Sequence, residues 1–355
     1  MRTLRIAGVE PGQRAAGLSA GSARWLPGAL AGYDQLFAAV GLRPARIEQL
    51  ALAARDALAG WAPDLSAELD FLAEASGVPP WRIHAVNART ELLAAAGAAG
   101  RAECSTVAGV SSGTNSKSAM IGAQTWDWHR ELAGFWAVLD YPQARRPFVT
   151  LTEFGLLGKI GINSAGVGVL FNILSHRSDT GDGGVPVHAV ARRILDSAGN
   201  VEAGISILRS APLAASSCFT LLDATRLACL EASPAGVAEL PQARWSVHTN
   251  HFQDPELAAG ALPATSDSDS LPRHEVLTAR SAAGAESAEE LADLLCAHES
   301  DGAGVCCHPA VDAPLGSGWQ TLATVGLSPA SRRMSVLAGG PCGRPEQRWR
   351  QFRAG

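Results

Sequence analysis

The feature that most constrains the fold of this chain is an abrupt change of sequence pattern at residue 104. Before it, apolar residues recur at three- and four-residue spacing through Ser22–Val40 and Pro44–Ala59, which predicts amphipathic helices. From Ser105 onward, short apolar runs bounded by Gly, Ser and Asn predict strands. A helical segment followed by strands, helices and more strands favours helices layered on antiparallel sheets over a doubly wound parallel fold.

Turn and cap residues divide the chain into further elements. We expect Asp64 or Ser66 to cap a helix that Pro79-Pro80 ends, and Gly199-Asn200 to separate two later helices. The other expected helices are Trp81–Ala96, Pro186–Ser197, Val201–Arg209, Asp269–Ala282 and Ala288–His298. The expected strands are Ser105–Val110, Ala119–Trp126, Phe135–Asp140, Phe148–Phe154, Gly166–Ile173, Ser217–Asp223, Leu227–Ala232, Trp245–Thr249, Thr321–Val325 and Arg333–Leu337.

Composition argues against several kinds of partner. Hydrophobic residues make up 47% of the 355 residues and charged residues 18%, which is typical of a globular chain. The formal net charge is −5 and no run of Lys or Arg occurs, so we expect no nucleic-acid partner. Arg5 and Glu10 interrupt the N-terminus before an apolar run of signal-peptide length can build. No apolar stretch is long enough to cross a bilayer, so we expect a soluble, cytoplasmic protein without a membrane partner.

The cysteines are odd in number and lack the spacing of a scaffold. There are seven, and no C-x-x-C pair occurs, which argues against a disulfide framework and a structural zinc site. His248 and His251 are three residues apart but do not belong to an H-E-x-x-H motif, so we expect neither a metal nor a resident cofactor. The seven are Cys104, Cys218, Cys229, Cys296, Cys306, Cys307 and Cys342.

Cys104 differs from the other cysteines in its position. It lies where a helical segment and a small-residue loop give way to strands, between Glu103 and Ser105. Cys218 and Cys229 lie inside apolar hairpin strands, as core cysteines do. Position alone leaves two interpretations of Cys104 open, a core residue or a chemically active thiol.

A series of motifs distinguishes these two interpretations. The motifs are Ala102-Glu-Cys-Ser-Thr, Gln124-Thr-Trp-Asp-Trp, Thr152-Glu-Phe-Gly-Leu-Leu-Gly-Lys-Ile-Gly-Ile-Asn-Ser-Ala-Gly-Val, Gly184-Val-Pro, Val247-His-Thr-Asn-His, Asp269-Ser270 with Arg273, and Ser317 ahead of Thr321-Leu322. In this order and spacing the chain resembles the isopenicillin-N acyltransferase (acyl-CoA:6-aminopenicillanic acid acyltransferase) family, a branch of the cysteine N-terminal nucleophile hydrolases. Residues 1–103 match only as a helical segment, by position and by Asn87-Ala-Arg-Thr-Glu.

The resemblance implies an α+β fold, a four-layer αββα sandwich with a helical N-terminal pro-segment. Residues 1–103 would form that pro-segment, which stays bound as a small subunit after self-cleavage, and residues 104–355 the catalytic large subunit. The cut would fall between Glu103 and Cys104. The thiol attacks the Glu103 carbonyl, and water opens the resulting thioester. The new α-amine, with a pKa near 7.7–8.0 by reference values, then acts as the base for the thiol.

The resemblance also assigns roles to four other residues. Asn250 would donate to the oxyanion of the tetrahedral intermediate, which is usually the largest single catalytic contribution. Asp127 would hold the new amine or its hydrogen-bond network. Thr106 and Ser317 would line the site and assist self-cleavage. Taken without the resemblance, these residues are an ordinary turn Asn, a strand-end Asp and two strand or loop hydroxyls.

Two departures from the family pattern concern the substrate. Gly318 stands where an arginine follows the serine that matches Ser317, and the family's Cys-Arg-His-Pro string here is Cys306-Cys307-His308-Pro309. The missing guanidinium bears on recognition of a carboxylate-bearing penicillin. It leaves the chemistry of Cys104 unchanged.

We therefore expect a self-processing acyltransferase that moves an acyl group through a Cys104 thioester to a small-molecule amine, in specialised-metabolite or antibiotic biosynthesis. The donor would be an acyl-CoA or another acyl thioester, acting as co-substrate rather than cofactor. An amidohydrolase or small-peptide hydrolase with the same nucleophile is the alternative, because water competes with the amine unless the site excludes it. An inactive homologue acting as a binding protein is a third hypothesis.

Overall fold

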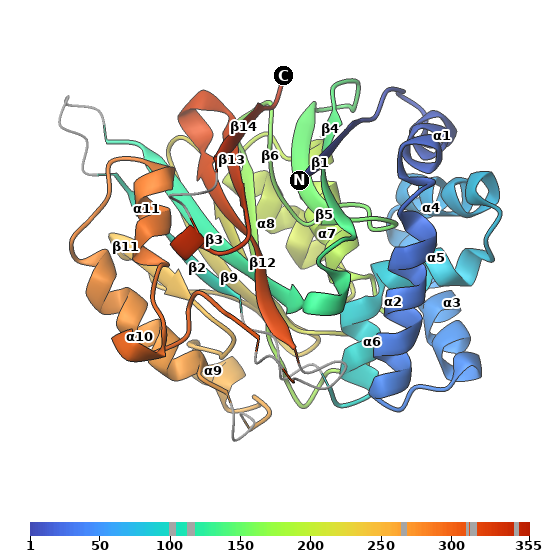
Figure 1. Cartoon of the computed structure of the whole chain (residues 1–355). Helices are drawn as coiled ribbons and strands as arrows, with labels where there is room; N and C mark the ends of the chain where they lie inside the picture. The colour runs from blue at the N-terminus through green and yellow to red at the C-terminus, as the bar shows by residue number, and fades with distance from the viewer. Residues whose placement is uncertain (99–103, 112–117, 264–267, 310–311, 313–317, 344–347) are drawn as a thin grey trace.

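Two β-sheets lie face to face in this protein, and helices cover their outer faces (Figure 1). The structure is a computed structural model that describes residues 1–98, 104–111, 118–263, 268–309, 312, 318–343 and 348–355. Glu103 and Ser317 therefore lie outside the described residues. Among the helices of the described part, none is both long and apolar enough to cross a membrane.

The larger sheet has eight strands and is antiparallel except at one edge. There, β1 runs parallel to β4, with Thr3 opposite Val138. The strand at this edge was not predicted, because a four-residue segment with an arginine at each end gives a weak apolar pattern. In spatial order the strands are β1 (Arg2–Arg5), β4 (Trp136–Tyr141), β5 (Phe148–Glu153), β6 (Ile160–Asn163), β7 (Gly168–Ile173), β8 (Ser217–Leu222), β9 (Leu227–Ser233) and β10 (Gly236–Glu239).

The smaller sheet has six strands, and Cys104 lies at the start of one of its interior strands. Its second strand in spatial order begins directly after that cysteine. A bulge interrupts the pairing of the third and fourth strands between Thr321 and Ala323, opposite Asp127. In spatial order the strands are β11 (Trp245–His248), β2 (Ser105–Val110), β3 (Met120–His129), β12 (Trp319–Ser328), β13 (Arg333–Ala338) and β14 (Arg350–Arg353).

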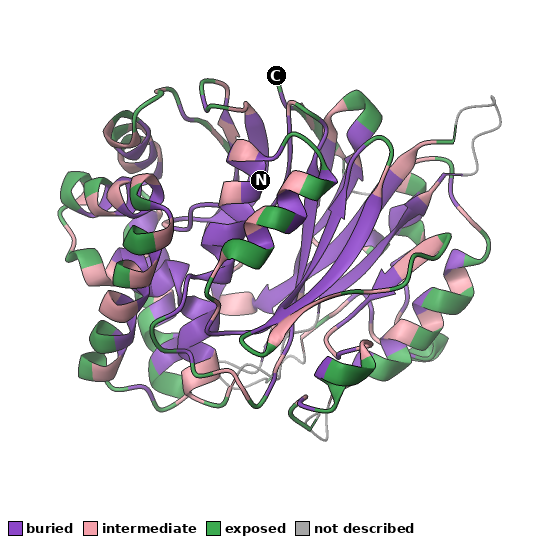
Figure 2. Cartoon of the chain, turned by 180° about the vertical axis from the view of Figure 1, so that it is seen from behind, coloured by how far each residue is buried: buried purple, intermediate pink, exposed green. Residues whose placement is uncertain are grey.

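The layers follow from which helices contact which sheet. Helices α7 (Val187–Ser197) and α8 (Val201–Ser210) pack on the eight-stranded sheet, and α10 (Ser270–Ser281) and α11 (Ala288–Leu294) pack on the six-stranded sheet. Strands β2 and β3 contact β7 across the interface between the sheets, where both sheets are buried (Figure 2). The chain is thus the four-layer αββα sandwich that the sequence predicted.

Six helices at the N-terminus form a separate layer against one end of the sandwich, and we call residues 11–95 the helical head (Figure 1). Proline opens five of these helices, as its fixed φ and missing N–H favour. Gly77, with a positive φ of 64°, ends α4. The helices are α1 (Pro11–Ser22), α2 (Leu26–Ala39), α3 (Pro44–Trp61), α4 (Pro63–Ser76), α5 (Pro80–Asn87) and α6 (Arg89–Ala95).

Several sequence predictions were wrong in detail. Asp64 and Ser66 lie inside α4, whose N-cap is Ala62. The predicted helix Trp81–Ala96 is two helices that meet at Ala88, and Ala288–His298 is helical only to Leu294. Strands β6, β10 and β14 were missed, as was the short helix α9 (Pro255–Ala258), because four residues give too little periodicity. Single 3-10 turns complete the described elements: Arg130–Leu132, Glu299–Asp301, Pro329–Ser331 and Pro341–Gly343.

Candidate active site

Cys104 is the residue directly before β2, and it is buried with 4% of its surface exposed. Its Sγ lies 3.9 Å from the backbone oxygen of Asp127 on the neighbouring strand β3. The helical head ends nearby in sequence, so the thiol lies at the junction that the sequence analysis singled out. The Cys104 thiol, just before β2, therefore faces the interior of the sandwich rather than solvent.

The backbone oxygen of Cys104 has two side-chain donors. Asn172 on β7 donates from Nδ2 at 2.9 Å, and Arg273 on α10 donates from Nη1 at 3.1 Å. The same Nη1 lies 3.0 Å from the Ser105 Oγ. These contacts come from both sheets and from an outer helix, so they fix the backbone on either side of the Cys104 carbonyl.

Arg273 also connects Cys104 to Asn250. Its Nη2 donates to the Asn250 Oδ1 at 3.1 Å, while Asp269 accepts from its Nε at 2.6 Å. The Asn250 Nδ2 donates to the backbone oxygen of Ile173 at 3.0 Å. Asn250 follows β11, which pairs with β2, so strand pairing brings its amide to the Cys104 end of the sheet.

Thr106 takes part in the same network through Asn172. The Thr106 Oγ1 donates to the Asn172 Oδ1 at 2.8 Å. Sequence analysis missed Asn172 as a site residue, although a signal was present. An Asn in the middle of the entirely buried strand β7 needs hydrogen-bond partners, and such partners are often functional.

Asp127 lies on β3 and is fully buried. Its Oδ1 accepts from the Thr321 Oγ1 at 2.5 Å, and that hydroxyl accepts from the backbone N–H of Cys307 at 2.9 Å. The bulge in β12 at Thr321 accompanies this contact. The structure therefore brings together Cys104, Thr106, Asp127 and Asn250, four of the predicted site residues.

Burial is the main influence on the thiol of Cys104, and it raises the pKa above the ordinary value. The positive charges of Lys159 and Arg273 oppose this shift, whereas the Asp127 carboxylate adds to it. The thiol is thus protonated at neutral pH in this state. A nucleophile in this condition needs a base to take its proton.

Lys159 is the second residue that the sequence analysis did not assign to the site. Burial lowers the pKa of Lys159 to about 7, while Glu153 favours its charged form. Its Nζ is 3.7 Å from the Glu153 Oε2 and 4.1 Å from the Trp126 ring centroid. The sequence did carry a signal for Lys159. It lies in an apolar run between Gly158 and Ile160, and a fully buried lysine is rare.

The helical head contributes charge to this site. Arg89 of α6 pairs with Glu153 at 3.2 Å and lies 4.0 Å over the Trp128 ring. The Tyr33 hydroxyl of α2 donates to the same carboxylate. Burial raises the pKa of Glu153, but Arg89 and Lys159 outweigh it and hold the pKa below its usual value.

His248, considered above as a metal ligand, has a different function in this network. Its Nε2 lies 2.8 Å from the Glu231 Oε1, and its Nδ1 lies 2.9 Å from the Thr249 oxygen. Burial lowers the pKa of His248, but the Glu231 carboxylate outweighs this and raises it overall. Both ring nitrogens are engaged, so His248 holds the loop that carries Asn250.

A cleft of about 710 Å³ opens beside these residues. Among the residues that the structure describes, its lining includes Asp269, Cys307 and Trp319. Asp269 binds Arg273, and Cys307 binds Thr321, so the walls of the cleft contact the hydrogen-bond partners of Cys104 and Asp127. Gly318 is covered by Arg130, since a Cβ there would come within 2.9 Å of the Arg130 Cδ.

A buried cysteine directly before an interior strand of an αββα sandwich is the arrangement that the resemblance implied. Comparison with known sequences narrows the class. The profile of the family "Acyl-coenzyme A:6-aminopenicillanic acid acyl-transferase" matches residues 114–342, well over half of the chain. The chain belongs to this family, as its motifs predicted.

Two individual proteins are similar to the chain. "Acyl-coenzyme A:6-aminopenicillanic-acid-acyltransferase 40 kDa form" from Emericella nidulans is 32% identical over 134 residues, which are 37% of this chain and 37% of that protein. The alignment thus spans little more than a third of the relative. Among solved structures, penicillin V acylase from Agrobacterium tumefaciens matches with a TM-score of 0.45 and 17% identity, over 65% of this chain and 82% of that one.

Proposed function

We propose that this protein is a self-processing acyltransferase whose nucleophile is Cys104. The observation that carries the proposal is the arrangement of Arg273, which bonds to the carbonyl of Cys104 and to the amide of Asn250 at once. The backbone of Cys104 and the side-chain amide of Asn250 thus share one hydrogen-bond network, which supports a nucleophile and an oxyanion donor acting at one site. Membership in the acyltransferase family supports the same chemistry.

The first reaction in this proposal is self-cleavage. The Cys104 Sγ attacks the carbonyl carbon of Glu103, and the bond from that carbon to the Cys104 nitrogen breaks. The nitrogen takes a proton and becomes a free α-amine, while the Glu103 acyl group is held as a thioester on sulfur. Water then adds to the thioester, which releases a carboxylate at Glu103 and regenerates the thiol.

Self-cleavage supplies the base that the buried thiol lacks. Burial raises the pKa of Cys104 in the uncut chain, so its thiolate is scarce. An α-amine has a pKa of about 7.7–8.0, so a useful fraction is neutral at pH 7. It takes the thiol proton directly or through water, and Asp127 and Thr106 orient the groups around it. Residues 1–103 remain as the small subunit and 104–355 form the large subunit.

The second reaction moves an acyl group. The thiolate attacks the carbonyl of an acyl-CoA or another acyl thioester, and the tetrahedral oxyanion receives a hydrogen bond from the Asn250 Nδ2. The bond from this carbonyl carbon to the donor's sulfur then breaks, and the donor's thiolate takes a proton and departs as a thiol. The acyl group stays on Cys104. A small-molecule amine then attacks this thioester and gives the amide product. The cleft beside Asp269 is large enough for a small-molecule ligand.

Amide hydrolysis with the same nucleophile is the second candidate, and the openness of this cleft to solvent favours it. Water in the cleft would accept the acyl group whenever no amine is bound. Product analysis separates the two activities: an acyl-CoA is supplied with and without candidate amines, and amides are supplied alone. An amide product supports transfer, and release of free acid from amides alone supports hydrolysis.

Intact mass of the purified protein tests the self-processing step. We expect two fragments, residues 1–103 and 104–355, from the wild type, and one uncut chain from Cys104→Ala with no turnover. Cys296→Ser is a matched control, because this half-buried cysteine lies outside the network, and we expect it to be cut normally. A Cys104→Ala protein that is processed and active would overturn the mechanism. A wild-type chain that stays uncut and inactive would support a binding protein instead.

A further inference from the structure

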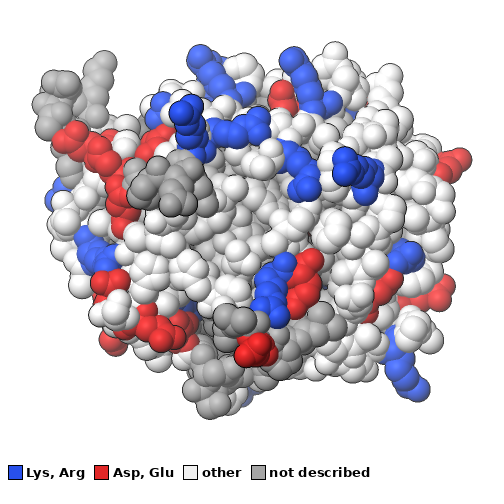
Figure 3. Space-filling model, in the orientation of Figure 1, with Lys and Arg blue, Asp and Glu red and all other residues white. Residues whose placement is uncertain are grey.

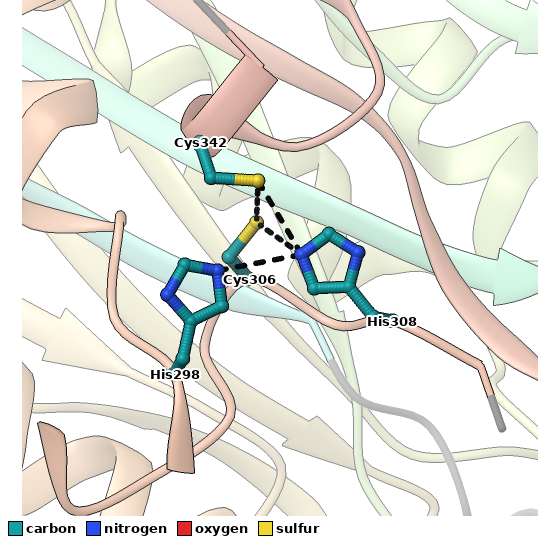
Figure 4. A group of neighbouring side chains, drawn as sticks. All are labelled: His298, Cys306, His308 and Cys342. Carbon is teal, nitrogen blue, oxygen red and sulfur yellow. Dashed lines mark hydrogen bonds between the residues drawn. The ribbon is translucent and has the colours of Figure 1, made fainter. Parts of the chain in front are cut away.

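Two histidines and two cysteines converge in one cluster near the surface (Figure 4). They are His298, Cys306, His308 and Cys342, and their ligand atoms all lie within 4.8 Å of one another. The residues come from separate segments: the loop after α11, the stretch before β12 and the turn after β13. Sequence spacing did not reveal the group, because no C-x-x-C pair is involved.

Four of the six distances between these atoms are close to the edges of a tetrahedron around a zinc ion. The His308 Nε2 is 3.3 Å from the His298 Nε2, 3.5 Å from the Cys306 Sγ and 3.3 Å from the Cys342 Sγ. The two sulfurs are 3.4 Å apart. Zinc bonds of about 2.0–2.1 Å to nitrogen and about 2.3 Å to sulfur place tetrahedral ligands about 3.3–3.8 Å apart. We propose that these four side chains bind one zinc ion.

The chemistry of the ligands favours zinc over the other common divalent ions. Two thiolates and two imidazoles form a soft to borderline set, which suits zinc, whereas calcium and magnesium prefer oxygen. Four protein ligands also fill the coordination shell, as in structural rather than catalytic zinc sites. The site is therefore a structural Cys2His2 centre, with no position left for a substrate.

Neighbouring groups support His298, Cys306 and the turn that carries Cys342. The His298 Nδ1 is 3.9 Å from the Asp301 carboxylate, and Arg280 pairs with that carboxylate at 3.2 Å. The backbone N–H of Cys306 donates to the Ala297 oxygen at 2.8 Å. The absence of a side chain at Gly340 lets the turn that carries Cys342 approach Cys306, since a Cβ at residue 340 would come within 2.3 Å of the Cys306 Sγ. Carboxylates beside ligating histidines are common in zinc sites.

The proposed centre is connected to the candidate active site by one short path. Cys307, next to the ligand Cys306, donates its N–H to the Thr321 hydroxyl, which donates to Asp127. Zinc would thus pin the segment 306–308 and the turn after β13 to β12, and keep Thr321 on Asp127. An ion can enter from solvent, because Cys342 is exposed and His298 lines the open cleft.

A second group of three ligand-type residues lacks this character. Cys218, Cys229 and His248 are buried together, with the two sulfurs 3.4 Å apart. Both ring nitrogens of His248 already bond to Glu231 and the Thr249 oxygen, so neither can bind a metal without breaking a buried hydrogen bond. The proposal is therefore limited to the group around His308.

Metal analysis of the full chain, purified without a polyhistidine tag, tests the site. We expect about one zinc per chain after dialysis, and at least a tenfold lower content in Cys342→Ser and in His308→Ala. Cys296→Ser and Cys307→Ser are matched controls that leave the four ligands in place, and we expect them to keep the metal. Zinc content is measured whether or not the chain is cleaved, so this result is independent of the proposed function.

Cobalt substitution keeps the test decisive if a variant fails to fold. Wild-type protein stripped with a chelator and given Co²⁺ should show tetrahedral d–d bands and thiolate charge-transfer absorption, and added Zn²⁺ should remove both. Wild-type protein with no more zinc than the Cys342→Ser variant, and with no such cobalt spectrum, would overturn the proposal. So would a Cys306–Cys342 disulfide in the native protein, seen as a mass lower by two hydrogens.

Discussion

The contact between the two sheets and the contact between the helical head and the sandwich share one apolar core but differ in their buried charge. Between the sheets, contacts are mainly apolar, as where Gly122 leaves room for Leu170 and Leu222. Between the head and the sandwich, the buried contacts include charged groups. Apolar contacts lose stability gradually as atoms are removed, whereas a buried charge without its partner is costly at once.

Two carboxylates organise the head-to-sandwich interface, one from each side. Glu68 of the head bonds to Arg14 of the head at 2.7 Å and to both Nη groups of Arg192 in the sandwich at 3.1 Å. Glu153 of the sandwich binds Arg89 and Tyr33 of the head. We therefore expect the head to stay attached after the proposed cut before Cys104, because separation would break both of these buried ion pairs.

The charges on the surface differ from those at this interface. On the face shown in Figure 3, basic and acidic side chains both occur and most of the area is uncharged. Ion pairs between exposed side chains are screened by water and contribute little to the stability of the protein. This difference between exposed and buried charges indicates that attachment of the head depends on the buried ion pairs rather than on the number of ion pairs.

Of the substitutions that test this comparison, Glu68→Gln has the largest expected effect on stability. It leaves the buried guanidinium of Arg192, and that of Arg14, without a carboxylate. We expect a loss of about 3–5 kcal/mol in the free energy of unfolding. Urea denaturation of the purified chain measures it, and gel filtration after processing shows whether the head separates. A loss no larger than that of an exposed pair would contradict the interpretation of the interface.

Asn250→Ala tests the sandwich side of the comparison, where the network serves chemistry rather than attachment. Loss of a single oxyanion donor costs about 10²–10³-fold in kcat. We expect a drop of that order in kcat, with the head still bound. Steady-state kinetics measure the effect, and co-elution of the two fragments is the control. An unchanged kcat would exclude Asn250 as the oxyanion donor.

Much of the sandwich could be predicted from the sequence, because its strands are short apolar runs and its turns carry Gly and Asn. The strand Ser105–Val110 has the bounds that were expected, and β5 and β7 differ from the prediction by only a residue or two. The break at Ala88 could not be predicted from helical periodicity, because Asn87 turns its amide to the sandwich, at 2.7 Å from the Gly155 oxygen. That contact is tertiary and leaves no trace in the local pattern.

The residues of the candidate site also fall into two groups, those that the sequence indicated and those that only the tertiary structure brings to the site. Cys104, Asp127 and Asn250 lie in recognisable motifs, and their predicted roles stay predictions. Asn172 and Lys159 reach the site because strand pairing and burial bring them there, which spacing along the chain does not indicate. Glu103 and Ser317 lie outside the described residues, so their predicted roles have no structural counterpart.

Glu91→Gln gives a smaller effect that depends on pH. Glu91 of the head accepts from the Val187 N–H at 2.8 Å, and burial raises the pKa of its carboxyl to about 7. The raised pKa means that the folded state holds a proton that the unfolded state has lost above about pH 4.5. Its stability contribution is full below that pH and is lost as the pH rises through 7.

The substitution removes this titration, since glutamine keeps the acceptor and is neutral at every pH. Relative to wild type, we expect the variant to gain on the order of 2 kcal/mol between pH 5 and pH 8. Urea denaturation at the two pH values measures the difference. A variant whose stability difference from wild type is the same at both values would show that Glu91 is ionised in the folded protein.

Asp182→Asn has the smallest expected effect and completes the comparison. Asp182 of the sandwich pairs with Arg46 of the head at 3.4 Å, so this ion pair bridges the same two regions as the pair of Glu68 and Arg192. Its side chains are 39% and 42% exposed, and water solvates each charge when the other is removed. We expect a loss of less than about 1 kcal/mol, and less still in high salt. A loss as large as that of Glu68→Gln would show that bridging the two regions, rather than burial, makes a charge important to attachment of the head.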